Sequence, residues 1–370
     1  MLKLPNHTLK ILWAAHRDPF NPRAGGAERT IREVCIRLIK GGHKVTLLTG
    51  GFKGCKTVDN LQGVKIYRFG KYILPHLALP YFLIKYRYDI VVNDLGHAVP
   101  WVLSGLFGKK NVAFFRHLHA RSLPGQVNLI TAKLLASVEK YYPIIYRDAV
   151  FVIESSASRR DLIKLGIHGN RIFTIKPGVD KELFRPTAKT HNPTLVYFGG
   201  MRRYKRPEES IYLLENLITK LANIRLIIIG SGPEGKSLKK LAMELRLSDS
   251  ITFMGKVTNE ELAKTVASSW LNIHSSVTEG WGLSILEASA SGTPTVAYRV
   301  SGVEDVIEDG INGLKVLDGD RASLANAAFI ILSNPKNWWL SSLNVANKYS
   351  WEETVQAWEN LFNKLNRAIS

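Results

Sequence analysis

Strand-like and helix-like segments alternate along this chain on both sides of one short interruption. The first half opens with a β-rich run at 10–15, which is followed by apolar residues at helical spacing up to Gly41. The second half opens with a β-rich run at 195–198. Between them, residues 176–193 are rich in proline and hold few long apolar runs. Because 370 residues exceed one ordinary core, the pattern predicts two doubly wound α/β domains joined by a linker.

The second half carries two carboxylates, Glu279 and Glu287, around a Gly-x-Gly turn. Gly280 and Gly282 allow a close approach of ligand that side chains would block. Apolar residues recur at helical spacing from Leu283, so the turn predicts a helix start, whose free amides form an anion site. Eight positions span up to roughly 12 Å along a helix. Glycosidase carboxylate pairs lie closer, at about 5–9.5 Å. Groups at either end of a diphosphate suit the spacing better, and a nucleotide sugar is such a ligand.

The segment EGWGLSILEA at 279–288, with Ala-Ser-Gly-Thr-Pro at 290–294, resembles the E-x7-E signature of the family-four retaining glycosyltransferases. In that family the first glutamate meets the hydroxyls of the donor sugar and the second meets the nucleotide ribose. The resemblance implies these roles for Glu279 and Glu287. A surface glutamate followed by a solvated helix glutamate is the alternative. The expected nucleotide-binding residues of this segment are Gly280, Trp281, Gly282, Leu283 and Glu287.

Three further segments extend the resemblance over nearly the whole chain. They are Gly25-Gly26-Ala27-Glu28, the stretch from Gly178 to Pro186, and Gly230-Ser231-Gly232-Pro233. The resemblance implies the GT-B fold, in which two Rossmann-like domains face each other across a cleft. It also implies a last helix that crosses back to the first domain. We therefore expect an acceptor-binding domain at 1–180, a nucleotide-sugar-binding domain at 181–350, and the returning helix within 351–370.

Basic residues follow the first strand of the second domain. Breaking a glycosyl–phosphate bond leaves a diphosphate whose growing charge must be stabilised by cations and amides. The resemblance gives Lys205 the phosphate contact. The family's arginine directly after the strand glycine is missing here, because that position is Gly200. Arg202 or Arg203 is expected to take its place, and a solvated basic loop is the alternative.

Three other places are expected to contact the donor. Gly25 and Gly26 stand at a strand-to-helix turn, where an anion nest or a plain helix start fits the sequence. A family histidine at a strand end touches the donor sugar, and that position falls on His117 or its neighbour Arg116. The nucleobase is expected on the backbone of Gly255, Lys256 and Val257. None of the residues considered above is assigned to a metal ion, so neither a metal ion nor another cofactor is expected.

The net charge of +19 favours anionic partners. Nucleic acid is not an expected partner, because the chain lacks a zinc finger, an RNP motif and a long basic arm. Residues 71–87 form an apolar segment with basic and tyrosine flanks that is too short to span a bilayer. This segment would lie in the interface of an anionic membrane or pack between strands. The two cysteines form no disulfide pattern and no signal peptide is visible, so we expect a cytoplasmic protein, peripheral on the inner face of the membrane.

These observations together predict a retaining, hexosyltransferase-type enzyme. It would move a sugar from a nucleoside-diphosphate sugar to a sugar or lipid-linked acceptor. One alternative is a nucleotide-sugar-hydrolysing epimerase on the same fold. Another is a non-catalytic, polyanion-binding protein with a degenerate donor site, against which the intact Glu279, Glu287 and Lys205 argue.

Overall fold

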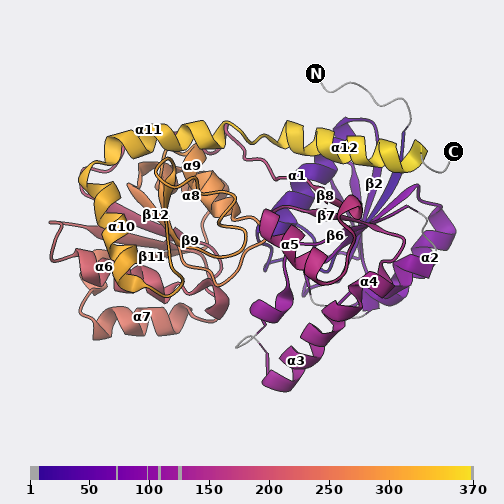
Figure 1. Cartoon of the computed structure of the whole chain (residues 1–370), viewed down its shortest axis with the longest axis horizontal. Helices are drawn as coiled ribbons and strands as arrows, with labels where there is room; N and C mark the ends of the chain where they lie inside the picture. Colours follow the sequence, from indigo (N-terminus) through magenta and orange to yellow (C-terminus); the bar gives the residue numbers. More distant parts are fainter. Residues whose placement is uncertain (1–7, 72–73, 98, 107–109, 124–126, 368–370) are drawn as a thin grey trace. The chain divides into compact units, whose positions relative to one another are not determined.

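The chain divides into two compact units (Figure 1). The computed structural model describes residues 8–71, 74–97, 99–106, 110–123 and 127–367. The first unit comprises Met1–Ala120, Ile130–Gly178 and Trp351–Ser370, and the second comprises Arg121–Leu129 and Val179–Ser350. The sequence-based boundary assigned residues 121–129 to the first domain. In the structure, Arg121 Nη1 donates a hydrogen bond to Ser301 Oγ of the second unit at 2.7 Å.

The first unit is built on a mostly parallel sheet. Its strands are β1 (Lys10–Ala14), β2 (Lys44–Thr49), β3 (Val58–Leu61), β4 (Val64–Arg68), β5 (Ile90–Asp94), β6 (Asn111–Phe114), β7 (Val150–Ile153) and β8 (Ile172–Thr174). Its helices are α1 (Gly26–Lys40), α2 (Leu74–Tyr86), α3 (Leu129–Val138), α4 (Tyr142–Ile145), α5 (Ser156–Lys164) and α12 (Trp351–Arg367). The strand order is β3-β4-β2-β1-β5-β6-β7-β8, so the direction of winding reverses between β1 and β5.

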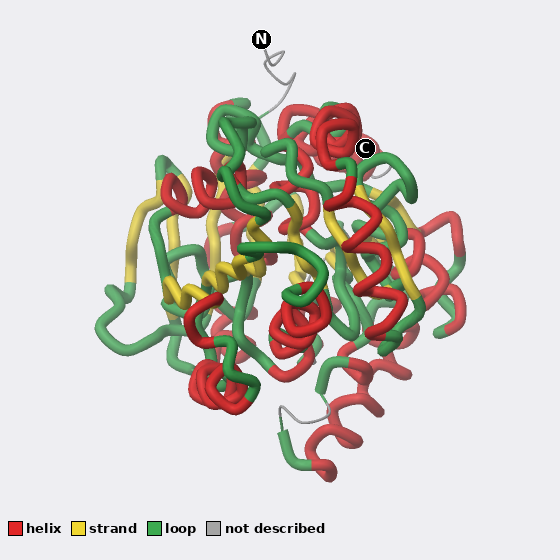
Figure 2. The backbone as a smooth tube through the Cα atoms, turned by 90° about the vertical axis from the view of Figure 1, so that its left-hand side faces the viewer, coloured by secondary structure: helices red, strands yellow, loops and turns green. Residues whose placement is uncertain are grey.

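Alternate residues of β1 face opposite layers of helices. Leu12 and Ala14 lie in a core with Leu79 of α2 and Leu162 of α5. Trp13 points to the other side, where its ring centroid lies 5.1 Å from that of Trp358 in α12. This two-sided burial explains why β1 reads as a continuous apolar run. Figure 2 distinguishes the strands from the helices that flank them.

Helix α2 resolves the ambiguous segment at 71–87, of which residues 72 and 73 lie outside the described part of the chain. Ala78, Leu79 and Phe82 are buried in the core, while Leu77 and Ile84 are 60% and 65% exposed. The segment therefore packs on the core with one face, as one of the two expectations has it, while the expected contact with a membrane stays a prediction for the exposed face. Within the described residues, no helix is both long and apolar enough to cross a bilayer.

The second unit has the strand order β11-β10-β9-β12-β13-β14. Its strands are β9 (Thr194–Phe198), β10 (Arg225–Ile229), β11 (Ile251–Gly255), β12 (Leu271–His274), β13 (Thr295–Tyr298) and β14 (Gly313–Val316), and its helices are α6 (Glu208–Leu217), α7 (Gly235–Glu244), α8 (Asn259–Ser268), α9 (Leu283–Ala290), α10 (Arg321–Ser333) and α11 (Pro335–Ala346). All of its strand pairs are parallel. Helices α6, α7 and α10 cover one face, with Leu195 and Tyr197 of β9 beneath them. Val196 and Phe198 face α8 and α9.

This order is that of a dinucleotide-binding sheet, whose winding reverses between β9 and β12. In such sheets, ligands bind beyond the carboxyl ends of the strands at the point of reversal. The loops after β9 and β12 are therefore where a ligand of the second unit is expected. These loops carry two residues that the sequence singled out, Lys205 in one and Glu279 in the other.

Candidate active site

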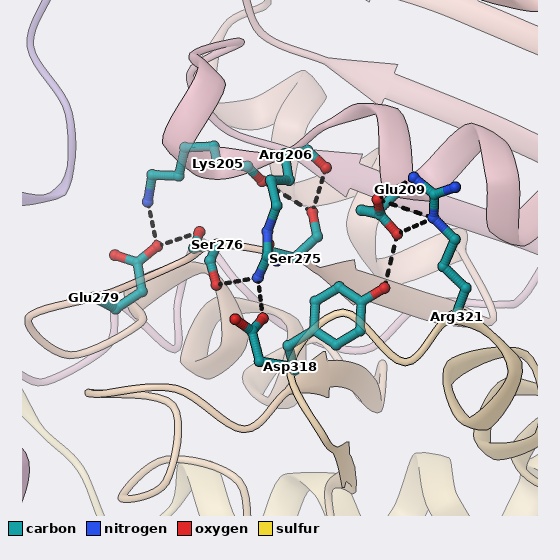
Figure 3. A network of polar contacts seen from close by, with 9 residues as sticks. Lys205, Arg206, Glu209, Ser275, Ser276, Glu279, Asp318 and Arg321 are labelled. Atoms are coloured by element: carbon teal, nitrogen blue, oxygen red, sulfur yellow. Dashed lines mark hydrogen bonds and ion pairs between the residues drawn. The ribbon is translucent and has the colours of Figure 1, made fainter. Parts of the chain in front are cut away.

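Lys205 and Glu279 form an ion pair at the point of reversal (Figure 3). Lys205 ends a single 3₁₀ turn, Arg203–Lys205, after β9, and Glu279 lies in the loop between β12 and α9. Two further groups contact the same carboxylate oxygen. Ser276 Oγ donates to Glu279 Oε1 at 2.7 Å, and His274 Nε2 lies 3.2 Å from it. The structure thus brings the two residues together, although they lie 74 positions apart in the sequence.

The charges in this cluster favour an ionised carboxylate. Burial raises the pKa of Glu279, but the positive charge of Lys205 and the contact with His274 outweigh burial, so the pKa lies well below its usual value. Burial lowers the pKa of Lys205, and the charge of Glu279 reverses this effect, so its pKa is raised. At neutral pH the pair is therefore a carboxylate and an ammonium ion. An ionised Glu279 can accept hydrogen bonds from sugar hydroxyls but cannot supply a proton.

The loop after β9 is fixed by the glycine-rich turn after β10. Met201 N donates to Ser231 O at 3.1 Å, and Glu234 N donates to Met201 O at 3.1 Å. A Cβ on Gly232 would lie 2.2 Å from the carbonyl oxygen of Met201. Any side chain at this position would push the basic loop away from its place. The Gly-Ser-Gly-Pro turn that the sequence singled out therefore supports the neighbouring loop.

The two candidate arginines differ in their placement. The Arg202 side chain lies over Gly200, where a Cβ built on the glycine would be 3.7 Å from Arg202 Nε. The Arg202 side chain thus lies next to the backbone of Gly200, at the place where a side chain of residue 200 would begin. Arg203 is exposed, whereas Arg202 is part-buried and close enough for its charge to lower the pKa of Lys205.

Gly282 begins α9 in the left-handed conformation, with φ 87°. This angle favours glycine, which is why the turn before Leu283 needs one. Glu287 lies buried on α9. Trp281 is 2% exposed, and its ring centroid lies 5.4 Å from that of Tyr349. The Trp281 side chain is therefore part of the core, and only its backbone remains for the nucleotide contact that the sequence predicts.

Gly302 lies against the backbone of Glu279. Its φ is 82°, and a Cβ built on it would lie 2.5 Å from Glu279 O. Glu279 N also donates to Ser301 O at 3.0 Å. The loop after β13 thus supports the carboxylate loop from behind. Sequence reasoning missed Gly302, because nothing in Arg299-Val300-Ser301-Gly302 marks it as a neighbour of Glu279.

The segment expected to hold the nucleobase ends β11. Gly255 has φ 69°, and its carbonyl oxygen accepts a hydrogen bond from Gly230 N at 2.7 Å. Lys256 is exposed, and Val257 packs partly against the core of α8 and α9. Gly255 is therefore tied to the glycine turn after β10, next to the loop that carries Arg202.

In the first unit, the Gly25-Gly26 turn begins α1, as the sequence predicts. Gly25 N already donates to Glu28 Oε2 at 2.7 Å, and Arg17 Nε donates to Glu28 Oε1 at 2.8 Å. The Gly25 amide is thus engaged within the turn. An anion near this turn would meet the charge of Glu28, which Arg17 offsets.

Arg116 and His117 take different places after β6. The Arg116 guanidinium is buried between Asp94, at 2.8 Å, and Glu154, at 2.6 Å. Arg116 therefore joins residues at the ends of neighbouring strands of the unit, which argues against the donor-sugar contact that the sequence left open between His117 and Arg116. The His117 side chain is only part-buried, with its ring centroid 5.0 Å from that of His119.

His119 and Glu139 form a pair that the sequence did not single out. His119 Nδ1 lies 3.3 Å from Glu139 Oε1, and the same oxygen accepts a hydrogen bond from His119 N at 2.6 Å. Both side chains are buried. The carboxylate fixes both the backbone turn and the imidazole ring beside His117.

Two family models match consecutive parts of the chain. "Glycosyltransferase Family 4" matches residues 24–183, and "Glycosyl transferases group 1" matches residues 179–346. The chain belongs to the family-four glycosyltransferases.

This glycosyltransferase is similar to curated enzymes of plants and bacteria. A phosphatidylinositol N-acetylglucosaminyltransferase component from Arabidopsis thaliana is 22% identical over 96% of this chain and 82% of the relative. A D-inositol 3-phosphate glycosyltransferase from Mycolicibacterium smegmatis is 29% identical over 59% of this chain and 53% of the relative.

Solved structures confirm the predicted GT-B fold of this glycosyltransferase. A sucrose-phosphate synthase from Thermosynechococcus elongatus has a TM-score of 0.81 at 21% identity, covering 98% of this chain and 100% of the other. The Anabaena protein HepE, crystallised with UDP and glucose, has a TM-score of 0.74 at 20% identity, covering 94% and 97%.

Proposed function

We propose that this glycosyltransferase transfers a sugar from a nucleoside-diphosphate sugar with retention of configuration. The observation that carries the proposal is the convergence of Lys205 and Glu279 at the point of reversal of the second sheet. Lys205 and Arg202 contact the diphosphate in this proposal. Glu279 accepts hydrogen bonds from the sugar, and Glu287 accepts them from the ribose.

The Lys205–Glu279 ion pair gives the donor a defined way to enter. The diphosphate attracts Lys205 and the sugar hydroxyls donate to Glu279, so the donor replaces each partner of the pair with a matching group. Neither charge is then left buried and unpaired, which would cost several kcal/mol. The lysine and arginine side chains supply the positive charge at the leaving group, so the proposal includes no resident metal ion.

Because Glu279 is ionised, it cannot supply a proton to the leaving group, so the proposed chemical step uses no protein acid. The bond between the anomeric carbon and the phosphate oxygen breaks while the acceptor oxygen attacks from the same face. The acceptor proton passes to an oxygen of the departing diphosphate, which completes the transfer. Lys205 and Arg202 stabilise the charge that develops on that diphosphate.

To identify the donor, UDP-glucose, UDP-N-acetylglucosamine and GDP-mannose are added separately to the protein. The melting temperature of the protein is measured as a function of the concentration of each. A ligand at 100 times its dissociation constant stabilises a protein by about 2.7 kcal/mol. Release of UDP or GDP that depends on a membrane-lipid extract and persists in EDTA supports transfer without a metal. Release of free nucleotide and modified sugar in the absence of any acceptor would instead indicate the epimerase-type reaction. Failure to bind any nucleotide would indicate a degenerate donor site.

The two arginines provide a direct test of the donor site. Arg202→Ala should lower the turnover by about 10²–10³-fold, as removal of one stabilising donor does in other enzymes. Arg203→Ala should lower it less, because Arg203 is exposed. An equal loss of turnover in both variants, or no loss in either, would contradict the proposal that Arg202 replaces the family's arginine, whose position is Gly200 here.

For the acceptor, we propose a lipid-linked molecule reached from an anionic membrane. The exposed face of α2 carries Leu77, Tyr81 and Ile84 at helical spacing, with Lys85 beside them. Such a face can enter the interface of a bilayer while Leu79 and Phe82 hold the helix to the core. Each lysine or arginine near an anionic surface adds about 1 kcal/mol of attraction, and salt weakens the effect.

Vesicle binding tests the membrane proposal. Leu77→Ser with Ile84→Ser should weaken binding to phosphatidylserine-containing vesicles at low salt and leave the melting temperature unchanged. Phe329→Ser, at an apolar residue of α10 that is 38% exposed, is the control on the second unit. Wild-type binding that is absent at low salt, or equal binding by the double variant, would contradict the proposal.

A further inference from the structure

Arg206 follows Lys205 directly in the sequence, yet its side chain points away from Glu279, the carboxylate proposed to bind the donor sugar. Its guanidinium donates to the backbone at the start of the loop after β12 (Figure 3). Nε donates to Ser275 O at 2.8 Å, and Nη2 donates to Ser276 O at 3.2 Å. Nη2 also pairs with Asp318. The guanidinium group is therefore committed to the protein.

The same two loops are bonded in the reverse direction. Ser275 Oγ lies 2.9 Å from Lys205 O and 2.8 Å from Arg206 O, and its one hydroxyl proton is shared between these carbonyl oxygens. Val277 N donates to Tyr204 O at 2.8 Å. Residues 204–206 and 275–277 are thus joined at several points. Lys205 extends from one side of this junction, and Ser276 holds Glu279 from the other.

A second layer of contacts fixes Arg206 from behind. Its guanidinium carbon lies 4.7 Å from the ring centroid of Tyr298 on β13. Tyr298 Oη donates to Glu209 Oε2 at 2.7 Å. Arg321 donates to both oxygens of Glu209, at 2.7 Å and 2.9 Å. Figure 3 shows Glu209 and Arg321 on the side of Arg206 opposite to Glu279.

The backbone of Arg206 adopts an unfavourable conformation. Its φ of 46° and ψ of 52° lie in the left-handed region, which glycine adopts without steric cost and in which an arginine is strained. Strain of this kind persists only where surrounding contacts hold it. A glycine would fit the backbone better, and at Arg206 the contacts of the guanidinium with Ser275 O, Ser276 O and Asp318 offset this strain.

We propose that Arg206 is a positioning residue for the transfer, holding Lys205 and Glu279 at the separation that the donor requires. This inference rests on the proposed function, because it assumes that both residues contact the donor. Arg206 itself touches neither the sugar nor the diphosphate. Misplacement of reacting groups by about 1 Å can lower a rate 10²-fold.

Arg206→Gly separates the side chain from the backbone, because it removes the guanidinium and relieves the left-handed strain. We expect kcat to fall at least 10-fold, with the dissociation constant for the bare nucleoside diphosphate, UDP or GDP, changed less than 3-fold. A loss of diphosphate affinity as large as the loss of kcat/KM would overturn the proposal, because Arg206 would then act on the binding of the diphosphate and not on the placement of groups for the transfer.

Arg246→Gly is the matched control. Arg246 is also a left-handed arginine, with φ 57°, and it is exposed in the loop after α7. Arg246→Gly removes one positive charge and relieves the backbone in the same way as Arg206→Gly, and we expect it to have the kcat of the wild type. Equal loss of kcat in both variants would show that net charge matters, and would overturn the assignment.

Arg206→Lys and a double variant complete the test. Lysine keeps the charge but cannot donate from one planar group to both carbonyls, so kcat should stay well below that of the wild type. Full activity of Arg206→Lys would overturn the proposal.

The double variant tests whether Arg206 acts through Glu279. The losses of kcat from Arg206→Gly and Glu279→Gln should be less than additive, because both act through Glu279. Fully additive losses would contradict the proposal. If the wild-type protein transfers no sugar, the proposed function fails; if it does and Arg206→Gly equals it, only this inference fails.

Discussion

Lys189 places an amine in neutral surroundings near the amino ends of β12 and β13 in the second sheet. Its Nζ donates to Ser269 O at 2.7 Å and to Thr293 Oγ1 at 2.8 Å, and it lies 5.4 Å from the ring centroid of Trp339. Burial lowers the pKa of Lys189 from 10.5 to about 7. The free energy of unfolding must therefore depend on pH through this one side chain.

The sign of this dependence follows from the proton count. Below pH 7 the amine is protonated in both states, so it adds no slope. Between pH 7 and 10.5 the unfolded state keeps a proton that the folded state has lost, so the stability rises with pH. At about 1.36 kcal/mol per pH unit, the full range is about 5 kcal/mol, and the step from pH 7, where the folded state is half deprotonated, to pH 9 is about 2 kcal/mol.

Lys189→Met removes the titrating group and fills the same space. We expect the variant to be more stable than the wild type at pH 6, and this advantage to shrink by about 2 kcal/mol between pH 7 and pH 9. Urea unfolding of the whole protein, followed by tryptophan fluorescence, measures the difference between variant and wild type. Lys264→Met, on the exposed face of α8, is the control and should give a curve parallel to that of the wild type. Parallel curves for Lys189→Met would refute the reasoning.

Three further outcomes are expected. Glu287→Ala should weaken nucleotide binding by about 1.5–3 kcal/mol in calorimetry, because a charged acceptor for the ribose is lost; unchanged affinity would contradict the ribose contact. Gly302→Ala should lower kcat and destabilise the fold by about 1–3 kcal/mol, because its Cβ would meet the backbone of Glu279; wild-type kinetics would show that the loop moves freely. Glu139→Gln should lower the melting temperature, because the new amide donor would face the amides that Glu139 now caps; an unchanged value would remove its structural role.

Much of the fold could be predicted because local pattern and tertiary structure agree. The strand at 195–198 and the helix that stops at Gly41 show the expected periodicity, and the structure has β9 and α1 there. The hairpin of β3 and β4 was missed. Its turn, Gln62-Gly63, has positive φ at both residues, but glutamine is not a usual residue for such a turn. Helix α2 was ambiguous because it is apolar on nearly all faces and contains Pro80.

The candidate site was only partly predictable, because motifs mark the residues that are expected to touch ligand and leave their supports unmarked. Lys205 and Glu279 stand in segments that resemble a known signature. Arg206 stands among basic residues that look alike in the sequence, and only the structure shows that its guanidinium bonds Ser275 and Ser276. Such long-range contacts depend on the order of strands in the sheet, which local spacing does not encode.

The membership of α12 in the first unit has a consequence for how the protein is made. Trp358 packs on Trp13 and Phe114, so one side of the first sheet is covered by a segment that leaves the ribosome after the whole second unit. The second unit can complete its core as soon as its last residue emerges, whereas the first must wait with Trp13 uncovered. Domains generally fold in the order of synthesis. Here the order is reversed for completion, so an interrupted chain that ends near Ser350 would carry a finished second unit and an unfinished first one.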